Sequence, residues 1–226
     1  MNNTNIKIGK RLTAAAKLCR KGSFIADVGT DHAYLPIYLL GMGHIRGGVV
    51  SDINKGPIER ARAHISEHGA ADKLVSVQCD GLSSLECFAP EDIFILGMGG
   101  ELIARIIADA PFTRKAGVRL ILQPMTHPEI LRGFLAKNGY DIIDEVLVKE
   151  EKIYQITVAE YSGVQRSYND LELMFGKKNI EAPSPILFEL LDRTVSVLRD
   201  RIAGKERAGA DASWEKAMIS QIGEIK

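Results

Sequence analysis

The sequence predicts an α/β protein built on a parallel β-sheet, because short apolar runs that end in acid or glycine alternate with segments of helical spacing. The first run, 24–31, reads FIADVGTD, and the second, 49–52, stops on an acid. Residues 75–81 alternate as a strand does and end in acid and glycine, and 92–96 leads into GMGG. Ligands of open α/β sheets lie outside the carboxyl ends of the strands, so we expect function to collect at these four strand ends.

The elements between and after these strands follow from helix and turn signals. Residues 57–69 predict a helix, with Pro57 near its first turn and Gly69 near its C-terminal stop. The alternation of strands and helices favours a parallel sheet throughout. The remaining predicted elements are a strand at 119–122, a helix at 127–137 closed by Asn138-Gly139, and strands at 140–148 and 152–159.

The last part of the chain predicts a helical tail. Strand alternation is lost after Ser162, and Pro183-Ser184-Pro185 precedes a long helix through about Arg207. Apolar residues then recur at coiled-coil spacing, and a turn at 204–212 leads to a second apolar stripe. We expect an antiparallel helix pair and two domains, residues 1–160 and 161–226. The two stripes are Leu187, Leu191, Thr194, Leu198 and Ile202, and Trp214, Met218, Ile222 and Ile225.

The first two strand ends predict a nucleotide-type cofactor site. Gly29 lets the backbone approach a ligand closely, and Asp52, roughly 20 residues on, is placed to accept hydrogen bonds from a ribose diol. The G-x-G-x-x-G pattern of nicotinamide enzymes is absent, since Asp27 precedes Gly29 and Asp31 stands where a glycine is usual. An acid before the glycine is the pattern of S-adenosylmethionine sites in Rossmann-like folds.

The third and fourth strand ends extend this prediction. Asp80 is of the type that accepts from an adenine amino group, although it could instead be a helix N-cap. Gly97 and Gly99 leave room for a flat base or a sulfonium, and Met98 offers an apolar contact. The catalytic candidates are Asp31, His32 and Met98. The cofactor candidates are Asp27, Gly29, Asp31, His32, Asp52, Ile53, Asn54, Asp80, Gly81, Leu82, Gly97, Met98 and Gly99.

Several motifs resemble those of the bacterial tRNA (adenine-22-N1)-methyltransferases, over essentially the whole chain. They are Arg11-Leu12, DVGTDHAYLP at 27–36, SDINKGP at 51–57, Asp80-Gly81-Leu82, GMGG at 97–100 and Gln123-Pro124-Met125. The resemblance implies a class I S-adenosylmethionine-dependent methyltransferase of Rossmann-like fold with a coiled-coil-like helical C-terminal domain. It also implies transfer of a methyl group to N1 of adenosine 22 in the D-arm region of tRNA, and a tail that helps to hold the tRNA. Without the resemblance, the pattern of the tail favours a structural or dimerising hairpin.

The charge distribution suggests where RNA binds. The net charge is zero, yet residues 1–26 carry six basic side chains and no acid. On a helical wheel most of these cations lie opposite an apolar side, which is either a solvated face or a phosphate-binding face. Arg11 lies off this arc and, as part of the family's Arg-Leu pair, is also a candidate for facing the site. The RNA-binding candidates are Lys10, Arg11, Lys17, Arg20 and Lys21.

Composition excludes several classes. The chain is 46% hydrophobic and 26% charged, and no apolar stretch approaches the roughly 20 residues that span a bilayer. Three cysteines without C-x-x-C spacing indicate neither a disulfide framework nor a zinc site, so we expect a cytoplasmic protein. As a separate expectation, a monomer is favoured. His64 and His68 lie one helical turn apart with no evident third ligand, so no metal is expected.

Two rival classes stay open. A flavin or nicotinamide oxidoreductase would use residues 97–102 as G-x-G-x-x-L, but the third glycine is missing. A non-catalytic RNA-binding protein on a decayed methyltransferase fold would have lost its strand-end acids, yet Asp52 and Asp80 are both present.

Overall fold

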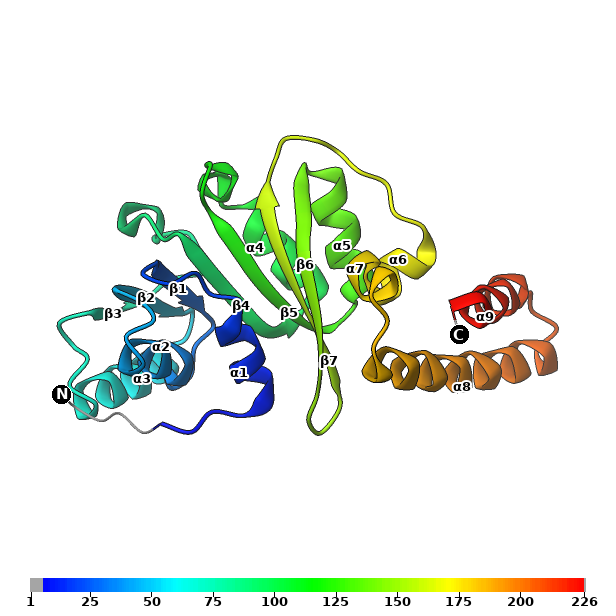
Figure 1. The fold of residues 1–226 in the computed structure, drawn as a ribbon, viewed down its shortest axis with the longest axis horizontal. Helices are drawn as coiled ribbons and strands as arrows, with labels where there is room; N and C mark the ends of the chain where they lie inside the picture. Colours follow the sequence, from blue (N-terminus) through cyan, green and yellow to red (C-terminus); the bar gives the residue numbers. More distant parts are fainter. Residues whose placement is uncertain (1–5, 226) are drawn as a thin grey trace.

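The computed structural model describes residues 6–225 and has a seven-stranded sheet with helices on both faces (Figure 1). The strand order is β3-β2-β1-β4-β5-β7-β6. Residues 1–5 and 226 of the two predicted domains lie outside the described residues. The strands are β1 (Phe24–Val28), β2 (Gly47–Asp52), β3 (Leu74–Gln78), β4 (Asp92–Gly99), β5 (Arg119–Thr126), β6 (Tyr140–Lys149) and β7 (Ile153–Tyr161).

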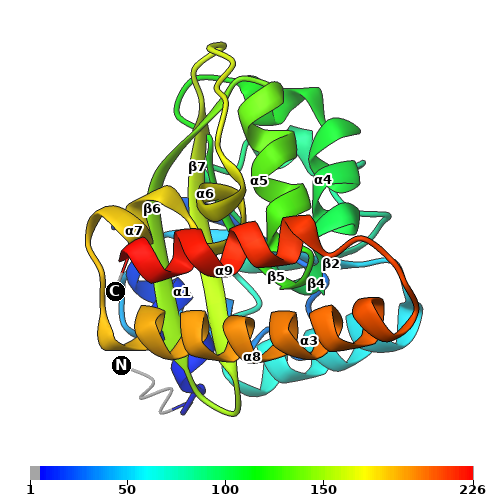
Figure 2. The ribbon, with the colours of Figure 1, turned by 90° about the vertical axis from the view of Figure 1, so that its right-hand side faces the viewer.

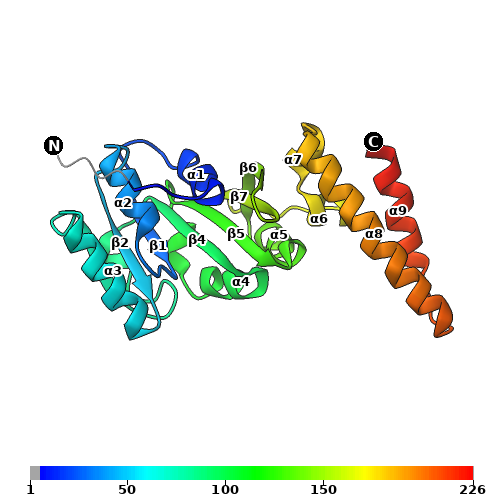
Figure 3. The same ribbon diagram turned by 90° about the horizontal axis from the view of Figure 1, so that it is seen from below.

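The helices of the sheet-containing part fall into two layers. One face of the sheet is covered by α1–α3, whose buried residues pack with Ile25, Val50 and Phe94. The other face is covered by α4 and α5, which pack with Ala26, Ile93 and the remaining strand residues that point to that side (Figure 3). These helices are α1 (Lys10–Lys17), α2 (Tyr34–Gly41), α3 (Lys55–Glu67), α4 (Gly100–Ala108) and α5 (Pro128–Lys137).

The sheet is mixed rather than wholly parallel, which corrects the prediction from the alternation of elements. Strands β1 to β5 are parallel, but β7 pairs antiparallel with both β5 and β6. Only three residues, 150–152, connect β6 to β7. A connection this short can form a hairpin but cannot make the crossover that a parallel pair requires.

The predicted helical tail is present and builds its own small core on β6. Phe175, Leu187, Leu191, Met218 and Ile222 are among its buried residues, and Leu147 of β6 packs against them. Figure 2 shows the two long helices side by side. Strand alternation stops after β7 because residues 162–169 are irregular and lead to two short helices. The tail helices are α6 (Asp170–Phe175), α7 (Lys177–Glu181), α8 (Pro185–Arg207) and α9 (Ser213–Ile225).

Helix α6 begins with a capping box. The sequence analysis used only the loss of strand alternation in this region and did not predict this helix. The Asn169 side chain accepts from the backbone of Glu172, whose side chain accepts from the backbone of Asn169. Among residues 6–225, no helix combines the length and the apolar character needed to cross a membrane.

Candidate cofactor and substrate site

The turn after β1 presents bare backbone at the carboxyl edge of the sheet. Gly29 has φ +77°, a conformation that side chains rarely adopt, and its backbone N–H donates to Ser51 O at 2.7 Å. A Cβ at Gly29 would lie 2.0 Å from the Met98 methyl carbon. Thr30 Oγ1 then accepts from the Ala33 backbone N–H at 3.0 Å, which fixes the loop that enters α2. The Met98 methyl therefore packs directly on Gly29, and a larger residue at position 29 would clash with it.

Four strand ends meet in a small cavity of about 140 Å³. Asp52 at the end of β2 is half-buried, and its Oδ1 accepts from the Asn54 backbone N–H at 2.7 Å. Gly81 has φ +55° and its Cα faces Ile106. The predicted candidates that line this cavity are Gly29, Asp52, Ile53, Asp80, Gly81 and Met98.

A second cavity, about 270 Å³, adjoins the first at Val28 and Gly29. Because the Met98 methyl lies over Gly29, the methionine stands where the two spaces meet. The arrangement suits a ligand with two arms, one in each cavity, whose centre passes Gly29. The second cavity is lined by Arg11, Leu12, Asp27, Val28, Gly29, Thr30, Asp31, His32, Ala33, Tyr34, Leu35 and Leu96.

The remaining cofactor candidates are not all brought to these cavities. Leu82 is buried in the core beneath the β3 end and lines a further cavity of about 100 Å³ with Asp80 and Gly81. Asn54, Gly97 and Gly99 line neither of the two adjoining cavities. Gly97 instead lies beside the Arg11 guanidinium, where a Cβ would be 3.9 Å from Nη1.

Arg11 points into the second cavity instead of joining the basic arc of α1. Its Nη1 donates to the buried Gln123 Oε1 at 2.8 Å, and its guanidinium lies 5.6 Å from the Tyr154 ring centroid. The structure therefore places Arg11 at the site, the second of the two positions considered for it. Neither Gln123 nor Tyr154 was a site candidate in the sequence analysis, although Gln123 belongs to one of the family motifs, because their contacts with Arg11 join segments that are far apart in the sequence.

Asp31 is exposed and already paired from two sides. Arg60 of α3 donates from Nε to Asp31 Oδ1 at 2.9 Å, and His32 Nε2 lies 3.3 Å from Asp31 Oδ2. No sequence pattern pointed to Arg60, which is 29 residues away along the chain. A ligand cation or a substrate base at Asp31 would share the carboxylate with this arginine.

Helix α1 ends at Lys17, so of the predicted basic arc only Lys10 and Lys17 lie on the helix, whereas Arg20 and Lys21 lie in the segment that follows it. Lys10, Lys17 and Lys21 are exposed. Arg20, in contrast, donates from Nε to Asp92 Oδ1 and from its backbone N–H to Oδ2, both at 2.6 Å, and Asp92 is fully buried. This ion pair fixes the segment that follows α1 to the start of β4, so we leave Arg20 out of the proposed RNA contacts.

One side-chain cluster supplies the third ligand that the sequence analysis did not identify. Ligand atoms of His64, Glu67 and His68 all lie within 4.8 Å of one another. The Nδ1 atoms are occupied, since His64 Nδ1 bonds to His32 O at 2.8 Å and His68 Nδ1 to His64 O at 2.9 Å. The spacing would admit a cation, and the bond from His64 to His32 ties α3 to the loop at the second cavity.

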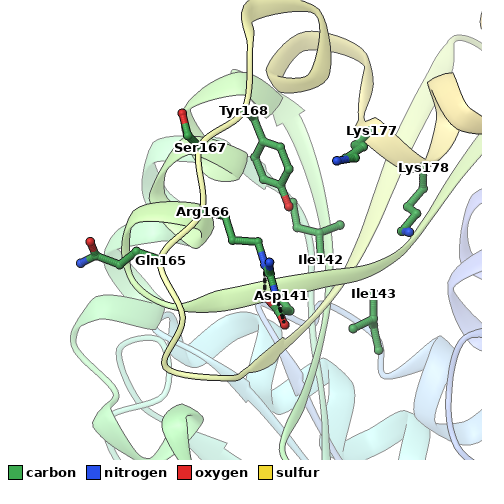
Figure 4. A pocket seen from close by; sticks show the side chains of 9 residues that line it. All are labelled: Asp141, Ile142, Ile143, Gln165, Arg166, Ser167, Tyr168, Lys177 and Lys178. Atoms are coloured by element: carbon green, nitrogen blue, oxygen red, sulfur yellow. Dashed lines mark hydrogen bonds and ion pairs between the residues drawn. The ribbon is translucent and has the colours of Figure 1, made fainter.

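A larger cavity lies elsewhere, between the sheet and the tail (Figure 4). Its volume is about 590 Å³. In its wall, Arg166 donates from Nη2 to Asp141 Oδ2 at 3.0 Å. Asp141 is near the start of β6, which runs parallel to β5, so this cavity is at the opposite edge of the sheet from the strand-end acids. It lacks a glycine turn, and we place no cofactor there. Its lining is Asp141, Ile142, Ile143, Gln165, Arg166, Ser167, Tyr168, Lys177 and Lys178.

Comparison with known proteins agrees with this geometry. A methyltransferase domain family model matches residues 8–157, which include every strand end described above. The tRNA (adenine(22)-N(1))-methyltransferase of Bacillus subtilis (strain 168) is 35% identical over 172 residues, which cover 76% of this chain and 72% of that protein.

Solved structures extend the likeness to the tail. A protein of the NADB-Rossmann superfamily from Streptococcus agalactiae superposes with a TM-score of 0.91 at 30% identity, over 99% of each chain. A Streptococcus pneumoniae protein in complex with S-adenosyl-L-methionine superposes with a TM-score of 0.86 at 31% identity, over 97% of this chain and 99% of that one.

Proposed function

This chain belongs to the family of tRNA (adenine(22)-N(1))-methyltransferases, and from that premise we propose that it transfers a methyl group from S-adenosylmethionine to N1 of adenosine 22 in tRNA. The observation that carries the proposal is the pair of adjoining cavities at the carboxyl edge of the sheet, with bare backbone at Gly29 and an acid at the ends of β2 and β3. We divide the chain into a catalytic part, residues 1–160, and a helical tail, 161–226, which has its own core.

The residues present fit the cofactor. Asp52 in the smaller cavity is placed for the ribose diol, and Asp80 beside it for the adenine amino group. The larger cavity then takes the methionine arm and the target base, with Asp27 and Asp31 as its acids. Met98, where the cavities meet, provides an apolar contact beside the reacting centre.

Positioning dominates the proposed chemistry. Bound S-adenosylmethionine supplies the methyl group, which forms a bond to the neutral N1 lone pair as its bond to sulfur breaks. No proton needs to leave N1 first, so the protein's tasks are to align the base and exclude water. N1 lies on the Watson-Crick edge, so the adenine must be unpaired or flipped out. The product ring is cationic, and the Asp31 carboxylate stabilises that developing charge.

We expect Asp31→Ala to reduce turnover on tRNA by about 10- to 100-fold, because it removes the carboxylate nearest the target base. Arg60 would also lose its partner and add an unpaired cation there. Arg60→Ala is the matched control, since it frees Asp31 without deleting it. Single-turnover methylation rates and calorimetric cofactor titrations separate the two effects. Near-normal turnover in Asp31→Ala would remove this residue from the mechanism.

Cofactor affinity should depend on pH through Asp27. Burial raises the pKa of this carboxyl from 3.8 to about 6, while a hydrogen bond from Thr30 and the charge of Arg11 oppose the rise. Below about pH 6 the free protein therefore holds Asp27 protonated, and a cationic ligand must displace that proton. We expect S-adenosylmethionine affinity to rise with pH through about 6 and then level off. Titrations at several pH values should give a flat profile for Asp27→Asn, and an equally steep profile in that variant would contradict the assignment.

The exposed lysines of α1, Lys10 and Lys17, and Lys21 in the turn that follows are proposed to contact tRNA phosphates. Neutralising Lys10, Lys17 and Lys21 together should weaken tRNA binding and leave cofactor affinity unchanged, because phosphate contacts position the substrate without touching the methyl donor. Each lost contact should lower the slope of log affinity against log salt by about 0.7 to 0.9.

The matched control removes three exposed lysines away from α1, at Lys73, Lys115 and Lys137. Affinities for tRNA measured at several salt concentrations compare the two triple alanine variants. Parallel salt plots for wild type and the α1 variant would assign these lysines to a solvated face.

The function itself is tested with labelled cofactor and two tRNA transcripts that differ only at position 22. We expect label in the transcript with adenosine and none above background in the one with guanosine. Equal incorporation into both would place the methyl group elsewhere. Purified protein that absorbs as a flavoprotein, or that binds a nicotinamide nucleotide, would favour the oxidoreductase class.

A further inference from the structure

Four rings form a continuous row that leads away from the larger cavity. We name His32, Tyr34, His64 and His68 the ring row. His32 and Tyr34 stack with centroids 5.1 Å apart and planes 24° apart. Tyr34 meets His64 edge to face at 5.0 Å, and His64 meets His68 in the same way at 4.4 Å. The row therefore spans from the loop after β1 to the C-terminal end of α3.

The row begins at the mouth of the site. His32 and Tyr34 both line the larger cavity together with Gly29 and Asp31. Tyr34 is 43% exposed, whereas the next residues of α2, including Leu35 and Ile37, are buried. Within residues 6–225 no hydrogen bond engages the Tyr34 hydroxyl. The protein thus holds a partly exposed aromatic side chain, stacked on His32, in the wall of the cavity.

Hydrogen bonds to backbone carbonyls hold two rings of the row in place. His64 Nδ1 bonds to the backbone carbonyl of His32 at 2.8 Å, and His68 Nδ1 to that of His64 at 2.9 Å. Because a carbonyl oxygen only accepts, the Nδ1 atoms of His64 and His68 each carry a proton. In a neutral imidazole the Nε2 atom is then left as an acceptor. Helix α3 therefore supports the loop after β1 and fixes the orientations of the rings, as a preorganised binding surface requires.

We propose that the ring row is a base-stacking platform, on which Tyr34 and His32 stack the adenine that enters the cavity, and His64 and His68 receive an adjoining nucleotide along α3. The proposal rests on the proposed function, since a base methylated on its Watson-Crick edge must leave its own stack. Proteins recognise unpaired RNA bases by stacking them on aromatic side chains and imidazoles. Imidazole Nε2 acceptors also suit the amino groups of nucleobases. A purely structural row would need no exposed ring at the cavity mouth.

The experiment compares Tyr34→Leu with Tyr34→Phe, which keeps the ring face. We expect Tyr34→Leu to weaken tRNA affinity by about 5- to 150-fold, the range for one lost stacking contact, and to raise KM for tRNA by a similar factor. Tyr34→Phe should recover that affinity, and the dissociation constant of S-adenosylmethionine should stay at the wild-type value in both. His68→Leu should show a smaller loss, since it lies at the outer end of the row.

The matched control is Tyr161→Leu, because Tyr161 is similarly exposed at 36% but ends β7 at the other edge of the sheet. A tRNA with 2-aminopurine at position 22 reports stacking directly, since its fluorescence is quenched on a ring. We expect quenching on wild type and Tyr34→Phe, and bright emission on Tyr34→Leu. Wild-type tRNA affinity in Tyr34→Leu, or a loss of affinity that Tyr34→Phe shares, would overturn the platform. These binding ratios test the row independently of which nucleotide the wild-type protein methylates, whereas the labelled-transcript assay tests the function.

Discussion

Replacing Arg132 with methionine is expected to lower the free energy of unfolding by about 3 to 5 kcal/mol, the largest stability effect we anticipate for one side chain. Arg132 is 1% exposed and donates from Nε to Glu145 Oε1 at 2.7 Å. It also donates to the Leu173 carbonyl and to Gln155 Oε1, both at 2.8 Å. Methionine would fill much of the volume but would leave a buried carboxylate without its cation.

The same pair fastens the tail to the sheet. Glu145 lies on β6, and its Oε2 accepts from the Lys178 backbone N–H at 3.0 Å, near the start of α7. We therefore expect Arg132→Met to loosen α6 and α7 first. Denaturant unfolding measures the total loss, and hydrogen exchange locates it.

The control for Arg132→Met is Arg193→Met, which breaks an exposed pair with Glu189 one turn away on α8. A surface pair of this kind contributes about 0.3 to 0.5 kcal/mol. If the two variants lost equal stability, the buried pair would be no more than a surface ion pair in energetic terms.

Replacing Asp52 with alanine is expected to weaken S-adenosylmethionine binding by about 1 to 3 kcal/mol, the scale of lost charge-assisted hydrogen bonds. The carboxylate is half-buried at the end of β2 and lines the smaller cavity beside Gly29. Asp52→Asn should lose less, because its amide oxygen can still accept from the Asn54 backbone as Oδ1 does now.

Calorimetric titration of Asp52→Ala is compared with Asp72→Ala, an exposed acid in the loop that precedes β3 at the opposite edge of the sheet. The control should bind as wild type does. An unchanged dissociation constant for Asp52→Ala would mean that the ribose does not lie at the end of β2.

The parts of the fold that could be predicted were those that depend on residues close together in the sequence. The apolar runs of β1 to β4 end at an acid or glycine because the chain must turn there, and α8 is marked by Ser184, whose side chain caps it, and by Pro185 in its first turn. The direction of β7 was missed, since alternation does not distinguish a hairpin from a crossover. Helix α3 begins at Lys55, two residues before the predicted start at Pro57.

The site could be predicted only where one residue type implies one role. Strand-end acids and glycine turns were visible in the sequence, and the structure brings most of them to two adjoining cavities. Pairings between distant segments were not visible. Arg20 looked like a free cation because its partner, Asp92, is 72 residues away, and Arg60 approaches Asp31 only through the packing of α3.

The central claim is that N1 of adenosine 22 is the methyl acceptor, and the most direct measurement combines primer extension with nucleoside mass spectrometry on tRNA treated with protein and cofactor. N1 methylation blocks base pairing, so we predict that reverse transcription stops one nucleotide before position 22 and that digestion yields 1-methyladenosine. A transcript that is read through position 22, or a digest in which the methyl group appears on another atom or nucleoside, would contradict the account.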